Sequence, residues 1–388
     1  MKNENLLQPE ITDVPVITFD KSRPARRRFL VKTSLVMATI FVCLIMLEVG
    51  LRILHRYPMD NHEGYFAQGG ISYVLKKNIT KDVVWPTMSF TVHTSDLGFR
   101  APQSGSQHIG ERPYYAILGA SDAFGNGLDY DKTFIGILAD KLKRSNNIDV
   151  VNMAIAGQHL MEQSALFKQF ASSQKQPPKA VVIVFNPLFI GGYNDNNTNV
   201  VVRRGDLFEG EHWRFALVKN LLGNTSSIYC FFRDGIRNVQ YKYLAHEDFA
   251  LSFYIKRFSS KHRIHNPEVS QDFLVKLKDL TDYIRSLNAV PIGVYCEPAG
   301  GFLLNDLMQK GKLEDGAIDT KYFVDLAQNF CAAEGIQFVN TTPVVQERYD
   351  KGEKLNFDGD GHYNGPTSQL VGNYLYEVLN PDRAAKQK

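Results

Sequence analysis

The chain has 388 residues, 44% of them apolar and 22% charged, a length and composition that suit one large globular α/β domain with attachments. Its formal net charge of +3 is too small to favour binding to nucleic acid. Its cysteines have no spacing typical of a zinc site, so we expect no metal and no other cofactor. We interpret Cys43, Cys230, Cys296 and Cys331 as buried free thiols, with a disulfide between the last two as the alternative.

The N-terminal region indicates a membrane anchor. Residues 1–28 are polar and end in Arg26-Arg27-Arg28, which predicts a disordered cytoplasmic tail. Residues 29–54 are mostly apolar, and at about 1.5 Å per helical residue they exceed the roughly 30 Å core of a bilayer. The arginines before this span predict an uncleaved signal-anchor of the inner membrane, with all later residues periplasmic or extracellular. A cleaved signal peptide and a buried soluble helix are the alternatives.

Between the anchor and the main domain, residues 55–110 form a Gly-containing extracytoplasmic lead-in. Its last part, Thr91–Arg100, is typical of an edge strand followed by a turn. We place the main domain at residues 111–386, with an aromatic-rich, partly helical insertion at about 200–268 that forms either a lid or a partner surface.

Within the main domain, apolar runs alternate with amphipathic stretches, which predicts βαβ units. We therefore expect an α/β fold of three layers, with a central parallel sheet of about five strands covered by helices on both faces. The expected strands are 114–119, 149–153, 179–186, 289–296 and 336–340, and the expected helices are 132–144, 160–172, 270–287, 320–334 and 366–380.

A serine follows the first expected strand of this domain. The run Tyr114–Leu118 breaks into a loop of small residues, Gly119–Ala123, which contains Ser121. The carboxyl ends of parallel strands are the usual ligand site of an open sheet, and small residues there allow a substrate to approach the backbone closely. The loop lacks the last glycine of a G-x-S-x-G elbow and the Lys-Ser/Thr of a phosphate loop. Ser121 is therefore the candidate nucleophile.

A second stretch, near the C-terminus, supplies a base and an acid. A serine hydroxyl needs a base to take its proton and a carboxylate to orient that base. His362 lies in a loop rich in Gly, Asp and Asn, with Asp360 two residues before it and Asp358 four before it. We favour Asp360 as the orienting acid and keep Asp358 as the alternative.

Together with Gly157, which follows the second expected strand, these residues resemble the blocks of the SGNH (GDSL-type) hydrolase superfamily. The resemblance covers residues 90–380 and includes Thr91–Arg100, which looks like the lead-in before the nucleophile in membrane-anchored members. It implies a flavodoxin-like arrangement of the three layers. The chain departs from the family's Gly-Asp-Ser by having Ala120 before the serine, which removes a hydrogen bond that braces the loop.

The same resemblance implies an oxyanion hole made of the Ser121 and Gly157 backbone N–H groups and an asparagine side chain. Gly157 could equally be an ordinary turn glycine. Asn194 has the letters of the family's Gly-x-Asn-Asp but lies too far beyond the strand, whereas Asn186 lies at the strand end without the motif. The position expected for this asparagine falls near Leu188.

The function that the resemblance implies is a membrane-anchored serine esterase or O-acyltransferase. It would act on an acyl ester of an exported glycan or lipid, with acetyl as the acyl group. The family's usual partner would be a membrane-bound O-acyltransferase. From another class of function, the alternative is a catalytically silent subunit that binds glycan or docks an acyltransferase, which the displaced asparagine and Ala120 favour.

Overall fold

The computed structural model describes residues 22–53, 64–70, 72–84, 88–102, 112–191, 200–203, 206–209, 222, 226–239, 254–313, 316, 318–357 and 360–380. The chain divides into two compact units, Met1–Arg56 and Tyr57–Lys388.

The first unit contains one long helix, α1 (Ser22–Ile53). Its stretch Arg27–Ile53 has 27 residues and contains an 18-residue segment with a mean hydropathy of 2.3, so its length and composition would allow it to cross a membrane. Glu48 and Arg52, which lie one turn apart, form an ion pair of 2.8 Å. The expected long apolar helix is therefore present.

The second unit is built on a parallel sheet of five strands in the order β11-β10-β7-β5-β6. All residues of β5 and β7 are buried, because this sheet is covered on both faces. The sheet confirms the predicted fold class. Its strands are β5 (Tyr114–Leu118), β6 (Asp149–Asn152), β7 (Ala180–Phe185), β10 (Val290–Tyr295) and β11 (Gln337–Asn340).

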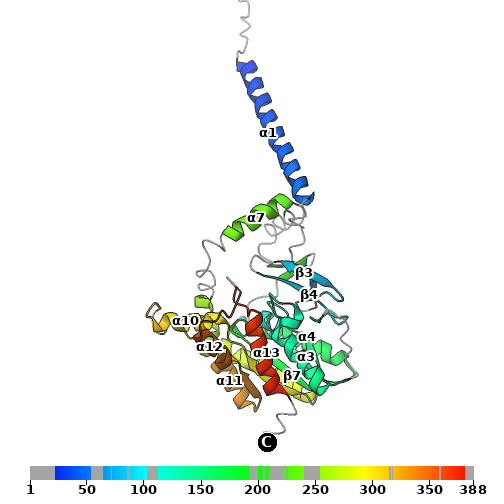
Figure 1. Ribbon diagram of the computed structural model, residues 1–388, viewed down its shortest axis with the longest axis vertical. Helices are drawn as coiled ribbons and strands as arrows, with labels where there is room; N and C mark the ends of the chain where they lie inside the picture. The colour runs from blue at the N-terminus through cyan, green and yellow to red at the C-terminus, as the bar shows by residue number, and fades with distance from the viewer. Residues whose placement is uncertain are drawn as a thin grey trace, which may run out of the picture. The chain divides into compact units, whose positions relative to one another are not determined.

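Two hydrophobic cores lie on opposite faces of the sheet, because successive strand residues point to opposite sides. Along β5, Tyr115 and Ile117 belong to one core, and Tyr114, Ala116 and Leu118 belong to the other. The helices that contribute to the first core are α3 (Phe134–Asn146), α12 (Thr342–Asp350) and α13 (Gly365–Leu379). Those that contribute to the second are α4 (Leu160–Ser173), α9 (Pro267–Ser286) and α11 (Tyr322–Ala333) (Figure 1).

Two antiparallel hairpins precede the sheet in the sequence. Their buried residues, among them Phe66, Tyr73, Phe90 and Val92, belong to the same core as α3 and α13. The predicted boundary at residue 111 stays a prediction, but residues on both sides of it pack into one core. The hairpin strands are β1 (Phe66–Gln68), β2 (Tyr73–Leu75), β3 (Thr80–Val84) and β4 (Ser89–His93).

Shorter elements complete the described chain: α2 (Ser121–Phe124), α5 (Pro187–Gly191), α10 (Ala299–Gln309) and, in the predicted insertion, β8 (Val200–Arg203), β9 (Asp206–Glu209) and α7 (Ser227–Val239). Cys296 and Cys331 are buried free thiols, so the alternative disulfide between them is wrong. Whether the insertion is a lid or a partner surface stays a prediction.

Candidate active site

Ser121 is the first residue of α2, in the tight turn that follows β5. A side chain at Gly119 would meet Ala123 Cβ at 2.8 Å and Val184 Cβ at 3.1 Å, so the turn requires glycine there. The Gly125 N–H donates to the Ser121 carbonyl at 2.9 Å, and Gly125 ends the helix with a φ of +83°. Ser121 is 7% exposed, at the carboxyl edge of the sheet where the sequence predicts it.

Arg100 clamps the loop behind this serine. Its guanidinium is fully buried and donates to three backbone carbonyls, those of Phe124, Gly125 (2.7 Å) and Leu128. It also lies over the Phe124 ring, 4.5 Å from the centroid. Burial lowers the pKa of Arg100 from 12.5 to about 10, which leaves it charged at neutral pH. The stretch that resembles a family lead-in therefore supplies a structural cation to the serine loop.

Two amide side chains hold the loop from the sheet side. Asn152 Nδ2 donates to the Ala123 carbonyl at 2.9 Å, and the Gly119 N–H donates to Gln163 Oε1 at 3.2 Å. These contacts brace the loop although Ala120 replaces the acid of the family motif. Sequence reasoning missed Asn152 and Gln163; the signal for each was a polar residue within an otherwise apolar strand or helix face.

His362 is oriented by Asp360. The Asp360 Oδ1 atom lies 2.5 Å from His362 Nδ1 and also accepts the His362 backbone N–H at 2.8 Å. A carboxylate at Nδ1 favours the tautomer with its proton on that nitrogen, which leaves Nε2 as the basic one. His362 Nε2 is buried and has no hydrogen-bond partner among the described residues. Asp358, the alternative acid, lies outside the described residues.

The pKa values of this pair move apart, as in an acid and base that form an ion pair. Burial alone would lower the pKa of His362, but the hydrogen bond and charge of Asp360, together with the charge of Asp122, outweigh it and raise the pKa. Burial alone would raise the pKa of Asp360, but the hydrogen bond and charge of His362 lower it. Asp360 and Asp122 thus stabilise the imidazolium form of His362.

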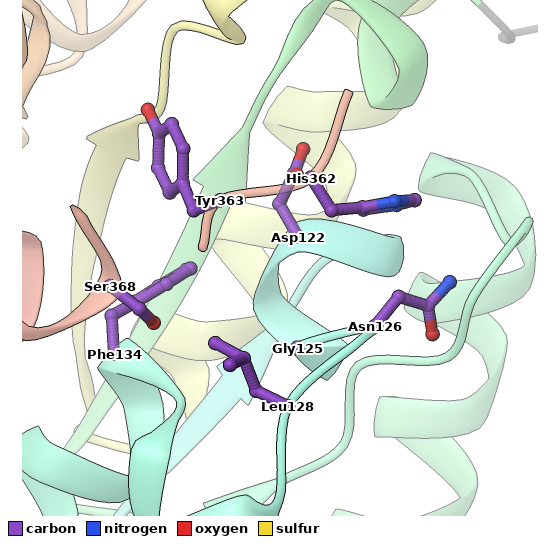
Figure 2. Close-up of a pocket in the computed structure, with 8 residues that line it drawn as sticks. All are labelled: Asp122, Gly125, Asn126, Leu128, Phe134, His362, Tyr363 and Ser368. Carbon is purple, nitrogen blue, oxygen red and sulfur yellow. The ribbon is translucent and has the colours of Figure 1, made fainter. Parts of the chain in front are cut away.

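Asp122, directly after Ser121, is the acid that sequence reasoning did not assign. It lines a small pocket that is partly open to solvent, and Figure 2 shows its side chain next to that of His362. Asn186 Nδ2 donates to Asp122 Oδ2, while Asn186 Oδ1 accepts the Phe189 N–H at 2.6 Å. Asn126 lines the same pocket, and its buried Oδ1 has no partner in the described part of the chain.

The candidate oxyanion donors are placed as follows. Gly157 follows β6 and has a φ of +79°, and a Cβ there would lie 2.7 Å from Tyr73 Oη. Its role as a turn glycine is therefore clear, and its role as a donor stays a prediction. Asn186 is 1% exposed and lies at the carboxyl end of β7, which neighbours β5. Asn194 lies outside the described residues.

The strand order brings three of the predicted residues together, since Ser121, Gly157 and Asn186 follow the adjacent strands β5, β6 and β7. His362 lines a pocket together with Asp122, the residue that follows Ser121, and no hydrogen bond joins His362 Nε2 to Ser121. Within the described ranges, no group of three or more His, Cys, Asp and Glu residues could hold a metal ion. The arrangement provides a hydroxyl, an oriented base and nearby amide donors, which is what acyl transfer through a serine requires.

No protein-family model and no curated protein matches the chain. It is similar to solved structures that include a lipolytic protein of the G-D-S-L family from Veillonella parvula, at 10% identity over 69% of this chain and 98% of that chain, with a TM-score of 0.39. Another is a catalytic mutant of the acetylxylan esterase Axe2 from Geobacillus stearothermophilus, at 12% identity over 70% and 96%, with a TM-score of 0.38. A third is the psychrotrophic esterase EstA from Pseudoalteromonas sp., at 14% identity over 69% and 96%, with a TM-score of 0.35. Similarity of this extent carries no conclusion about what this chain acts on.

Proposed function

We propose that this chain is a serine esterase or O-acyltransferase of the SGNH hydrolase type, anchored to the inner membrane by α1 with its second unit outside the cytoplasm. The observation that supports it most is the oriented His362, which has Asp360 at Nδ1 and an unpartnered Nε2. Such an imidazole is prepared to accept a proton from Ser121, the serine of the neighbouring loop.

The proposed reaction proceeds through an acyl-serine. Ser121 Oγ attacks the ester carbonyl carbon while its proton moves to His362 Nε2, and Asp360 holds the imidazolium that forms. The oxyanion is stabilised by the Ser121 and Gly157 N–H groups and by one asparagine amide. The bond to the leaving alcohol then breaks, and the Nε2 proton goes to its oxygen. Water or an acceptor hydroxyl attacks the acyl-serine, gives its proton to Nε2 and restores Ser121.

The substrate we propose is an acyl ester, with acetyl as the acyl group, of an exported glycan or lipid. The anchor would hold the site at the membrane surface where such polymers emerge, beside a membrane-bound O-acyltransferase. Asn126 supports an acceptor with hydroxyl groups, because it lines the pocket and its buried Oδ1, which can only accept hydrogen bonds, has no partner among the described residues. The triad serves hydrolysis and transfer alike.

Trapping the serine tests the activity. We expect a fluorophosphonate probe to label the purified full-length chain on Ser121 and Ser121→Ala to abolish both labelling and hydrolysis of 4-nitrophenyl acetate. Ser368→Ala is the matched control, because Ser368 is a buried serine that lines the same pocket, and it should keep labelling. Absence of labelling in the intact protein would contradict an active serine.

A reporter fusion tests the topology. We expect a periplasmic reporter fused after Lys388 to be active only outside the cytoplasm, because arginines precede the span. The N-terminus should be retained in the mature protein. A processed N-terminus within residues 40–60 would contradict the anchor.

The alternative function is a catalytically silent subunit that binds glycan or docks an acyltransferase. One observation favours it: the Asn186 amide already donates to Asp122. Labelling of Ser121 separates the two functions, since a silent subunit would bind an acetylated glycan without reacting with the probe.

A further inference from the structure

A half-buried acid directly follows the candidate nucleophile. Asp122 lies in the first turn of α2, and burial raises its pKa, while the charge of His362 and the hydrogen bond from Asn186 oppose that rise. A buried carboxylate is costly unless its partners compensate it. The partners of Asp122 come from two other parts of the fold, the end of β7 and the loop of His362, so it connects elements that the serine chemistry needs together.

The first partner, Asn186, is held at both ends of its amide. Its Oδ1 accepts the Phe189 N–H at 2.6 Å, and its Nδ2 donates to Asp122 Oδ2. A primary amide has two N–H groups, so one remains after the bond to Asp122. The reverse orientation of the Asn186 amide is excluded, because it would place Oδ1 against the Asp122 carboxylate and Nδ2 against the Phe189 N–H. The direction of the remaining N–H is therefore fixed by Asp122.

The second partner, His362, lies next to two carboxylates. Asp360 faces it from its own loop and Asp122 faces it from α2 (Figure 2). Burial raises the pKa values of Tyr254, Cys296 and Tyr363, and the charge of Asp122 raises them further. All three side chains are buried and therefore neutral at pH 7. Among the described residues outside the loop of His362, Asp122 is the ionisable side chain whose charge acts on the imidazole.

We propose that Asp122 is a positioning residue that serves both helpers of Ser121: it directs the free N–H of Asn186 toward the serine loop, and it adds a second negative charge beside the imidazole of His362. This proposal rests on the proposed serine chemistry, because both helpers matter only when Ser121 reacts. The second charge stabilises the imidazolium that forms as Ser121 loses its proton. The same carboxylate thereby links proton transfer to oxyanion binding.

Two substitutions separate the two effects. Asp122→Asn keeps an oxygen that can accept from Asn186 but removes the charge, whereas Asp122→Ala removes both. The full-length chain in detergent is assayed for kcat and kcat/KM on 4-nitrophenyl acetate across pH. In parallel, the ring protons of His362 are titrated by NMR, with the signal identified by its loss in His362→Gln. Asp131→Asn, an exposed Asp→Asn change nine residues after Asp122, is the control.

The expected direction of the pH shift follows from the role of His362 as the base. Activity rises as pH increases through the pKa of His362, because the neutral imidazole accepts the proton. Asp122 raises that pKa, so Asp122→Asn should move the acid limb of kcat/KM and the NMR titration to lower pH, by on the order of one unit. Its plateau kcat should stay within a few-fold of wild type. Asp122→Ala should show the same displacement with a kcat lowered about tenfold or more, because the Asn186 amide is released.

The outcomes distinguish a failure of the positioning role of Asp122 from a failure of the proposed serine chemistry. If turnover is normal and Asp122→Asn leaves both titrations in place, or moves them upward, the positioning role is overturned. If the intact chain shows no turnover but the NMR titration still moves down, the charge contact stands and the serine chemistry is what fails. A similar displacement in Asp131→Asn would show a general charge effect and would also overturn the proposal.

Discussion

Replacing Arg100 with methionine should both destabilise the fold and loosen the serine loop. The guanidinium donates to three carbonyls of that loop, and it is fully buried. A hydrogen bond to a charged group contributes about 1.5–3 kcal/mol, so three of them contribute about 4.5–9 kcal/mol. The pKa of Arg100 falls from 12.5 to about 10 on burial, which corresponds to an opposing cost of about 3 kcal/mol.

The difference between these contributions is a net stabilisation of about 2–6 kcal/mol, in the range expected when one partner of a buried charged contact is removed. Methionine keeps much of the apolar stem beside Phe124 but removes the guanidinium donor from all three carbonyls, of which Gly125 O keeps the Leu128 N–H at 3.3 Å. We expect Arg100→Met to lower the free energy of unfolding by about 3–5 kcal/mol. Fluorophosphonate labelling of Ser121 should slow by about tenfold or more, because the loop loses its fixed geometry.

The measurement is urea unfolding of the full-length chain in detergent, with the labelling rate taken at a urea concentration where the variant is still folded. Arg112→Met is the matched control, because Arg112 is partly exposed and forms an ion pair of 3.1 Å with Asp149. Such an exposed pair contributes less than about 1 kcal/mol. A loss for Arg100→Met that equals the loss for Arg112→Met, with an unchanged labelling rate, would refute the clamp.

Three further predictions concern the site itself. Asp360→Asn should lower kcat by about 10²- to 10⁴-fold because the wrong tautomer of the base is favoured, and unchanged kinetics would reassign the acid. From the sequence we expect Asn194→Ala to lower kcat by about 10²- to 10³-fold with little change in KM, and Asn186→Ala to lower kcat less. Near wild-type kcat in both variants would mean that the oxyanion hole has backbone donors only. Gly157→Ala should lower the free energy of unfolding by about 1–2 kcal/mol because of the left-handed φ alone, and by more because the new Cβ would contact Tyr73 Oη. Urea unfolding measures the loss, and Tyr73→Phe should partly relieve it. Equal stability of Gly157→Ala and wild type would contradict this prediction.

The sequence predicted the sheet well because each of its strands is an apolar run bounded by turn residues. The run Val181–Phe185, for example, has no polar residue, and only a strand buried on both faces needs that pattern. The strands β1 to β3 escaped prediction because they have three to five residues, too few to show a period, whereas the edge strand expected in Thr91–Arg100 overlaps β4. Their pairing depends on contacts with the core rather than on local pattern.

The candidate site was predicted in part. Ser121 lies in one short motif and Asp360 with His362 in another, so their residue types and order suggested a chemistry before any fold was known. Asp122 and Arg100 were not assigned, because each acts on residues far away in the chain. Asp122 contacts a residue 64 positions later, and Arg100 contacts carbonyls 24 to 28 positions later. Such pairs follow from strand order and register, which composition and spacing do not contain.

The hairpins also limit where the protein can be cut. Residues from Tyr65 onward fill the core beside α3 and α13, and Arg100 holds the serine loop. A protease that cleaved after Ala101 would remove these parts and release a fragment with an open core and a loosened loop. A fragment without α1 that keeps this core and the Arg100 contacts therefore has to retain the chain from Tyr65 onward.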